Sequence, residues 1–188
     1  MILNKLVHKI RIFKLKRRLR KLKSIGQACD INVKTTFVNP ENIEIGSYVY
    51  IGPNANINGL GKVFINNGTI IGPNITIHSA NHNYRNAKYV PYDETFDYRP
   101  VIIGENVWIG GNVIIVPGAE IGEGSIIGAG SVVSGKIPAL SIVVGNPAKI
   151  IRKRDDKHYF ELKENNRIYL KAKFSKELKS HENSNNRK

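Results

Sequence analysis

Along most of the chain, an aliphatic residue followed by a small or polar residue recurs every six positions. The series starts at Ile45-Gly46 and reaches Ile77-His78 with one two-residue interruption. It returns at Ile103-Gly104 after a long break, and the last of its twelve hexads is Val133-Ser134. Neither the 3.6-residue period of an amphipathic helix nor the two-residue alternation of a flat sheet fits this spacing. The pattern therefore predicts a repeat architecture.

A parallel β-helix accounts for the six-residue period. Three hexads make one triangular coil, in which each aliphatic side chain points inward and stacks on its equivalent about 4.8 Å away in the next coil. The neighbouring Gly, Asn or Pro suits a corner, where the chain bends sharply. Twelve hexads predict four complete coils, in an all-β fold. The alternative, a β-sandwich with many glycine turns, explains the regular spacing less well.

The pattern changes on both sides of the repeat and once within it. Residues 1–24 predict a basic helical arm, and residues 25–152 the β-helix domain with an extruded insert loop at 83–100. Residues 153–188 predict a C-terminal helical extension that ends in a disordered tail. A chain of 188 residues is long enough for one substantial domain with such appendages.

The basic charge lies mainly in the end segments. The net charge is +14, and residues 1–24 contain ten Lys/Arg and no acid. Residues 25–150 contain seven Lys/Arg against nine Asp/Glu, so the body of the protein is slightly acidic. A nucleic-acid-binding domain carries its basic surface on the domain itself, and we therefore expect no nucleic-acid partner.

The N-terminal arm contains two apolar stripes at helical spacing. One consists of Ile2, Leu6, Ile10 and Phe13, and the other of Leu15, Leu19 and Leu22. Such a helix either caps the open edge of the first coil or lies on an anionic membrane surface. We expect the capping role, through Leu6, Ile10, Phe13 and Leu15, with peripheral membrane contact as the alternative.

Several features bear on the compartment. No apolar run approaches the roughly 20 residues that span a bilayer. The N-terminus does not separate a basic region from an apolar block, as a secretory signal does. The single cysteine, Cys29, excludes an intramolecular disulfide and is typical of a reducing compartment. We expect a cytoplasmic protein, or one held at the inner face of the membrane by residues 1–24.

The second half of the repeat contains three motifs in a fixed order: IGENVWIGGN, GAGSVV and VVGNPAK, within residues 100–152. Upstream, IGPNITIHSANH occupies residues 71–82. These motifs resemble the hexapeptide acyltransferases, in particular the galactoside, maltose and polysaccharide O-acetyltransferases. The resemblance covers about residues 45–155. It implies a left-handed β-helix, a homotrimer and acetyl-CoA as the acetyl donor.

His82 lies where the chain leaves the repeat. In the enzymes that it resembles, the histidine at this exit point is the general base that takes a proton from the acceptor hydroxyl. Imidazole suits the task because a free histidine titrates close to neutral pH. The alternative is a polar loop histidine without a catalytic role.

His78 raises the question of a metal, because γ-class carbonic anhydrases use this fold and bind zinc with three histidines. The histidines other than His78 and His82 lie in the two end segments. A third ligand is therefore hard to supply, and we expect no metal site.

The resemblance also implies a set of CoA-binding residues. Trp108 corresponds to the tryptophan beside the pantetheine arm, and Lys149 and Arg152 to the basic residues that meet the CoA phosphates. Lys136 is displaced by one residue from the phosphate-binding lysine of the family. The small residues of the predicted CoA groove are Gly110, Gly111, Ala129, Gly130 and Ser134.

The acceptor side is less well defined. Asn56 matches an asparagine that contacts the sugar in the galactoside enzymes, but the segment after it is shorter than theirs and lacks their acceptor-binding aspartate. The insert supplies aromatic and charged residues suited to a carbohydrate: Tyr84, Arg85, Asp93 and Glu94. Asp93 or Glu94 is also a candidate for orienting the imidazole of His82.

Together these observations predict an acetyl-CoA-dependent O-acetyltransferase that modifies a sugar hydroxyl of a cell-surface polysaccharide unit or its precursor. Three sites between adjacent subunits are expected, because one flat wall offers little concavity for CoA. Two alternatives remain open. One is N-acetylation of an amino sugar or a xenobiotic, and the other is a non-catalytic β-solenoid scaffold.

Overall fold

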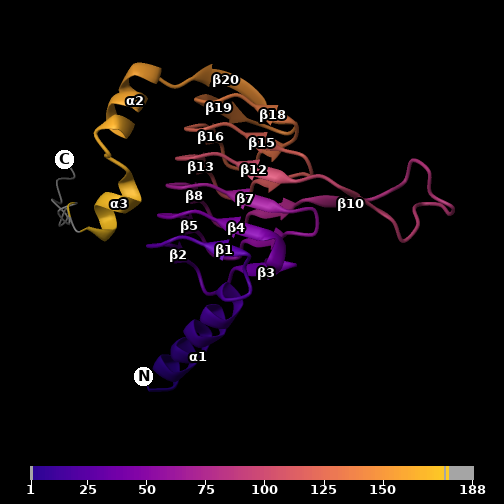
Figure 1. The fold of residues 1–188 in the computed structure, drawn as a ribbon, viewed down its shortest axis with the longest axis horizontal. Helices are drawn as coiled ribbons and strands as arrows, with labels where there is room; N and C mark the ends of the chain where they lie inside the picture. Colours follow the sequence, from indigo (N-terminus) through magenta and orange to yellow (C-terminus); the bar gives the residue numbers. More distant parts are fainter. Residues whose placement is uncertain (1, 176, 178–188) are drawn as a thin grey trace, which may run out of the picture.

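The computed structural model describes residues 2–175 and 177, and in it the chain forms a parallel β-helix with helices at both ends (Figure 1). Three parallel sheets make the walls of the prism. The first wall contains β1 (Ser24–Ile25), β4 (Ile43–Ile45), β7 (Val63–Ile65), β12 (Val101–Ile103), β15 (Glu120–Ile121) and β18 (Lys136–Ile137). The second contains β2 (Asp30–Ile31), β5 (Tyr50–Ile51), β8 (Ile70–Ile71), β13 (Trp108–Ile109), β16 (Ile126–Ile127) and β19 (Ser141–Val144). The third contains β3 (Thr36–Val38), β6 (Asn56–Asn58), β9 (Thr76–His78), β14 (Ile114–Ile115) and β17 (Val132–Val133).

The β-helix predicted from the six-residue period is confirmed, but the predicted number of coils is wrong. Five coils contribute a strand to all three walls, and a sixth contributes β18 and β19. The additional first coil comprises β1, β2 and β3, and Ile25-Gly26 and Ile31-Asn32 keep the six-residue spacing. A short 3-10 helix at Pro40–Asn42 lengthens the next interval. A strict period that starts at Ile45 therefore overlooks this coil.

The inward-facing aliphatic residues form one continuous core. Ile71, for example, is fully buried and lies in register between Ile51 of the coil before and Ile109 of the coil after. Burying one such side chain contributes about 1.5–3 kcal/mol. The largest fully buried side chains are all isoleucines: Ile43, Ile51, Ile57, Ile65, Ile71, Ile75, Ile77, Ile103, Ile109, Ile115, Ile121 and Ile127.

Asparagines stabilise the corner between the second and third walls. Asn54, Asn74 and Asn112 adopt left-handed backbone angles, with φ of 59°, 56° and 57°, which asparagine tolerates better than most residues. Their side chains form a ladder, because Asn54 Nδ2 donates to Asn74 Oδ1 at 3.0 Å and Asn74 Nδ2 donates to Asn112 Oδ1 at 3.1 Å. The left-handed backbone angle and the side-chain ladder together explain why asparagine recurs at this corner.

The insert is an antiparallel hairpin that projects away from the prism (Figure 1). Its strands are β10 (Ala80–His82) and β11 (Phe96–Tyr98), with His82 opposite Phe96. The chain re-enters the β-helix where the amide of Arg99 donates to the carbonyl of Ser79 at 2.9 Å. The hairpin therefore leaves and rejoins the prism at one point, the corner between the third and first walls.

Helices lie in both of the predicted helical segments. At the C-terminal end, β20 (Lys149–Lys153) pairs antiparallel with β19 and is followed by α2 (Asp156–Glu164) and α3 (Tyr169–Phe174). The carboxylate of Asp155 caps α2 by accepting from the amide of His158. Residues 178–188, predicted to be a disordered tail, lie outside the described residues.

A polar network attaches α2 to the corner between the first and second walls. Lys163 forms ion pairs with Glu105 and Glu123. The hydroxyl of Tyr159 donates to Glu123 Oε1 at 2.9 Å and accepts from Asn106 Nδ2 at 3.1 Å. Burial, together with the neighbouring Glu123 carboxylate, raises the pKa of Tyr159 to about 12. The C-terminal extension is thereby held against the prism.

Among the described side chains of the N-terminal helix α1 (Ile2–Leu19), those that pack on the prism lie toward its C-terminal end. Leu15 and Leu22 are buried in the core, and the guanidinium of Arg18 donates to the carbonyls of Thr35 and Val33. Of the residues expected to cap the first coil, Leu15 is therefore the one found buried in the core. The expectation that Ile10 and Phe13 also cap the first coil is wrong, because the two side chains are 46% and 62% exposed. The side chains of Ile2 and Leu6 lie outside what the structure describes.

In the described part of the chain, none of the helices is both long enough and apolar enough to cross a bilayer.

Candidate functional site

His82 ends β10, outside the prism, and its side chain is exposed. The imidazole stacks on the ring of Tyr92, with centroids 3.9 Å apart and planes 16° apart, and the ring of Phe96 lies 4.5 Å away. Within residues 2–175 and 177, no protein group forms a hydrogen bond with the imidazole. The two aromatic rings therefore restrict the orientation of the ring without using either nitrogen.

A small cavity of about 120 Å³ lies beside His82. Its lining residues come from both hairpin strands, the start of the loop and the next coil: Asn81, His82, Asn83, Tyr84, Arg85, Asp97, Arg99 and Pro117. The structure thus brings the predicted residues Tyr84 and Arg85 to His82. Sequence reasoning missed Asp97 and Arg99, whose side chains form an ion pair at 2.9 Å. Asp97 lies opposite Asn81, and Arg99 follows β11 two residues later, a spacing that places both side chains on the same face of an extended segment.

Asp93 has a different role from the one expected. Its carboxylate accepts from the amide of Lys88 at 3.0 Å, and from the amide and hydroxyl of Thr95 at 2.9 and 2.6 Å. The Thr95 hydroxyl is the main cause that lowers the pKa of Asp93. Glu94 is exposed. This geometry does not support the prediction that one of the two carboxylates orients His82, because Asp93 instead closes the loop on itself.

The predicted acceptor residue Asn56 lies apart from this cavity. It begins β6 on the third wall, one coil before the hairpin leaves, and its side chain is exposed. Its neighbours in register are Thr36 and Thr76.

Trp108 lies on the second wall and is 55% exposed, between Ile70 and Ile126 of the adjacent coils. These three side chains contribute to a groove of about 390 Å³ between the wall and the C-terminal extension. The extension covers the groove with Leu162, Ile168 and Tyr169, and adds the cationic side chains of Arg154, Lys163 and Arg167. The sequence interpretation assigned Trp108 to the donor site but none of these residues of the extension, because the repeat does not indicate which wall the extension covers.

The small residues of the predicted CoA groove occupy two corners. Gly110, Gly111, Ala129 and Gly130 lie at the corner between the second and third walls. A Cβ on Gly110 would come within 2.7 Å of the amide nitrogen of Ala129, so close stacking of the coils requires glycine there. Ser134 lies at the other corner, between the third and first walls.

The predicted phosphate-binding cations are spread over two walls. Lys149 and Arg152 are exposed on β20, which extends the second wall beyond β19. Lys136 is exposed on the first wall and forms an ion pair with Glu120 at 3.0 Å. Lys149 and Arg152 thus share a wall with Trp108, whereas Lys136 does not.

One chain does not bring the predicted base and the predicted donor site together. The cavity beside His82 contains none of the predicted CoA-binding residues. Most of those residues belong to the second wall or its far corner, while the hairpin leaves from the corner between the third and first walls. Among the described residues, no group of three or more His, Cys, Asp or Glu side chains is placed to hold a metal ion.

Comparison with known proteins assigns this architecture to a family. The family model described as bacterial transferase hexapeptide (six repeats) matches residues 100–135. Galactoside O-acetyltransferase of Escherichia coli K12 is 35% identical over 143 residues, a match that covers 73% of this chain and 68% of that protein. The chain belongs to the hexapeptide-repeat acyltransferases. The enzyme class predicted from its motifs is therefore confirmed.

A further sequence relative and two solved structures are similar to this hexapeptide-repeat acyltransferase. WcaF of Escherichia coli K12, an acetyltransferase assigned to colanic acid biosynthesis, is 31% identical over 130 residues, or 69% of each chain. A galactoside acetyltransferase solved with coenzyme A superimposes with a TM-score of 0.68 at 30% identity, over 76% of this chain and 70% of that one. The acetyltransferase VCA0836 of Vibrio cholerae O1 biovar eltor, solved with acetyl-CoA, gives 0.66 at 27% identity, over 74% and 75%. These ligands agree with the predicted donor.

Proposed function

We propose that this hexapeptide-repeat enzyme transfers the acetyl group of acetyl-CoA to a hydroxyl group of a sugar, with His82 as the general base. The observation that carries the proposal is how the imidazole of His82 is surrounded. It is exposed, stacked on the ring of Tyr92 and close to the tilted ring of Phe96, and open at both nitrogens beside a polar cavity. A base must reach the proton that it abstracts, and this arrangement leaves it free to do so.

In the proposed reaction, His82 takes the proton of the acceptor hydroxyl as the oxygen attacks the thioester carbonyl carbon. The new C–O bond gives a tetrahedral intermediate, which collapses as the C–S bond breaks. The imidazolium then returns the proton to the departing CoA sulfur, so the products are an acetyl ester and free CoA. Contact with the rings of Tyr92 and Phe96 limits the loss of side-chain entropy when the base meets the hydroxyl.

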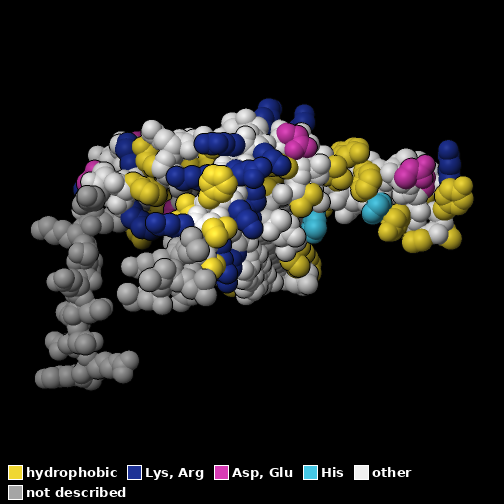
Figure 2. All heavy atoms as spheres, turned by 90° about the horizontal axis from the view of Figure 1, so that it is seen from below, with side chains coloured by type: hydrophobic (Ala, Val, Ile, Leu, Met, Phe, Trp, Pro, Cys, Tyr) yellow, Lys and Arg dark blue, Asp and Glu magenta, His cyan; other side chains and the backbone are white. Residues whose placement is uncertain are grey.

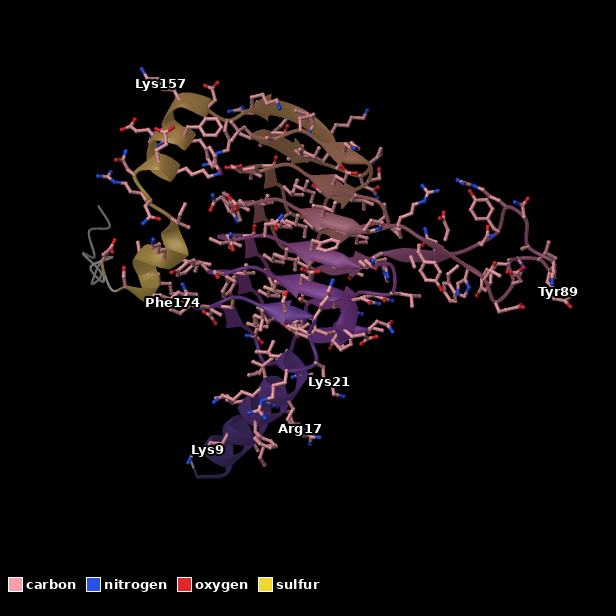
Figure 3. All side chains as sticks on the ribbon, in the orientation of Figure 1. Lys9, Arg17, Lys21, Tyr89, Lys157 and Phe174 are labelled. Atoms are coloured by element: carbon pink, nitrogen blue, oxygen red, sulfur yellow. The ribbon has the colours of Figure 1, made fainter. Side chains whose placement is uncertain are left out.

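The separation of His82 from Trp108 supports a shared site. We propose a homotrimer in which the hairpin of one subunit reaches the donor groove of the next. Closed cyclic assembly with one repeated contact would form three identical sites. The hairpin tip supports this proposal, because Tyr89 and Val90 are 70% and 96% exposed and a neighbour would cover them. Figure 3 shows Tyr89 at the far end of the hairpin.

For the donor, we propose that the groove at Trp108 holds the pantetheine arm, since its floor and cover are apolar and its rim is cationic. Lys149 and Arg152 on the same wall are placed to meet the CoA phosphates. Gly110, Gly111, Ala129, Gly130 and Ser134 would leave the backbone open to the pantetheine amides. Lys136 would have to leave Glu120 to take part.

For the acceptor, we propose that Tyr84 and Arg85 contact the sugar, because they line the cavity beside His82. Glu94 and Asn56 are kept as candidates for contact with the sugar only because their side chains are exposed. Asp93 would act by holding the loop in place, since its carboxylate is already occupied by three donors. The similarity to WcaF supports a polysaccharide unit or its precursor as the acceptor. We propose that the reaction takes place in the cytoplasm, where acetyl-CoA is available.

The test is to incubate the purified full chain with acetyl-CoA and a panel of neutral, acidic and amino sugars, and to measure the release of free CoA. Mass spectrometry and NMR of the product then distinguish an ester from an amide. We expect an O-acetyl sugar, and loss of its formation in His82→Ala but not in the matched control His78→Ala. An N-acetyl product, or CoA release that His82→Ala leaves intact, would contradict the proposal.

A further inference from the structure

The N-terminal helix α1 has two different sides. Leu15 and Leu19 face the prism and pack against its first coil. Val7, Ile10 and Phe13 are 38%, 46% and 62% exposed. Because successive residues of an α-helix are about 100° apart, these three side chains form one stripe on the side opposite Leu15 and Leu19. The cap of the β-helix therefore leaves an apolar stripe uncovered.

The same side of α1 becomes cationic toward the prism. Lys14 and Arg17 continue the direction of the apolar stripe, and with Arg18 and with Lys21, just after the helix, they line a groove of about 440 Å³. Arg18 is held by the carbonyls of Val33 and Thr35. In the described residues, no acidic side chain lies within ion-pair distance of the other three cations.

The figures show the same surface as a whole. Figure 2, which looks onto the end of the molecule that carries α1, shows Lys and Arg side chains gathered around hydrophobic ones. In Figure 3, Lys9 and Arg17 lie along α1 and Lys21 follows its end, all three away from the hairpin and from the C-terminal helices. Residues 1–24 contain ten Lys/Arg and no Asp/Glu.

We propose that α1 binds the surface of an anionic phospholipid bilayer. In this arrangement, Val7, Ile10 and Phe13 enter the boundary between headgroups and acyl chains, while Lys14, Arg17 and Lys21 meet the lipid phosphates. Helices with an apolar side next to Lys and Arg lie in the plane of this interface, held by apolar burial and by attraction to anionic lipid. The proposal is independent of the function proposed for His82.

Charge and apolar character together favour a bilayer over other occupants. A second copy of α1 would bring two strongly basic segments together, and like charges at close range repel. A nucleic acid would satisfy the cations but would leave the apolar stripe exposed to water. A bilayer that contains anionic lipid satisfies both parts of the surface.

The test uses the full chain and vesicles, in sedimentation assays. We expect binding to vesicles of phosphatidylglycerol and phosphatidylcholine, and at least tenfold weaker binding to phosphatidylcholine alone. Raising the salt from 0.1 to 1 M shortens the Debye length from about 10 to about 3 Å, and should weaken binding to the anionic vesicles at least tenfold. Equal binding to both kinds of vesicle would overturn the proposal.

Matched variants test the two parts of the surface separately. The double variant Lys14→Gln/Lys21→Gln should bind anionic vesicles about 25-fold more weakly, at about fivefold per cation. The control Lys62→Gln/Lys157→Gln removes the same charge elsewhere and should bind normally. Phe13→Ser should weaken binding about tenfold, whereas Phe174→Ser, on α3, should not.

Two outcomes would contradict this assignment. One is that the control variants lose as much vesicle binding as the α1 variants. The other is that Phe13→Ser leaves vesicle binding unchanged but reduces the size of the oligomer, which would make the apolar stripe an interface between copies. Thermal unfolding of each variant should stay unchanged, because Leu15, Leu22 and Arg18 are left in place.

Discussion

The wall around Ile71 and the hairpin around His82 are close in the chain but are held by different interactions. Ile71 is fully buried, and identical residues precede and follow it in register. His82 is exposed and rests on two aromatic rings from its own hairpin. The wall thus supplies stability, while the segment that leaves the repeat carries the proposed chemistry. Substitutions in the two regions should therefore change different measurable quantities.

The largest expected effect concerns the hairpin. His82→Ala should lower kcat by about 10²–10⁴-fold, because it removes the proposed base, while CoA affinity and the unfolding midpoint stay unchanged. Steady-state kinetics with the acceptor, together with thermal unfolding, measure both quantities. Near-normal kcat in this variant would remove His82 from the mechanism.

The complementary change in the wall should act on stability. Ile71→Ala should lower the free energy of unfolding by about 2–5 kcal/mol, because it leaves a cavity between two coils. Denaturant unfolding at constant protein concentration measures this change. Ile102→Ala is the control, since the Ile102 side chain faces outward on the first wall. This variant should lower the free energy of unfolding much less than Ile71→Ala does. Equal losses in the two variants would contradict the described core.

A smaller effect is expected at Trp108, which belongs to the wall but faces outward. Trp108→Ala should weaken CoA binding by about 1–2 kcal/mol through lost apolar contact. The free energy of unfolding should change little. Calorimetric titration of CoA without acceptor tests this directly, and unchanged affinity would make Trp108 a residue of wall packing only.

The smallest effect concerns the order of the hairpin loop and its dependence on pH. The pKa of Asp93 is lowered in the folded protein, so its carboxylate stabilises the loop above its unfolded pKa of about 3.9 and loses this role as pH falls through the lower folded value. Amide exchange at Thr95 should therefore accelerate only in strong acid. Asp93→Asn should show faster exchange at neutral pH. The same exchange rate in both proteins at pH 7 would show that the three hydrogen bonds do not order the loop.

The six-residue period was sufficient to predict the β-helix and its inward residues, because each coil repeats the same local requirement for an aliphatic side chain and a tight corner. It did not predict the first coil, where the 3-10 helix at Pro40–Asn42 changes the spacing. The exit histidine could be located by its place in a motif. Its contacts with Tyr92 and Phe96 could not, because they depend on the pairing register and loop conformation of the hairpin.

What the sequence by itself determined is the repeat, the position of His82 at the end of it, and the strongly basic N-terminal helix, since each depends on local spacing or composition. Only the tertiary structure decided which of the two apolar stripes of α1 packs on the first coil. Both have helical spacing, and Leu15 and Leu22 are buried while Ile10 and Phe13 are exposed. It also decided that Trp108 shares a groove with Leu162 and Tyr169, because contacts between segments far apart in the chain depend on how the extension folds back.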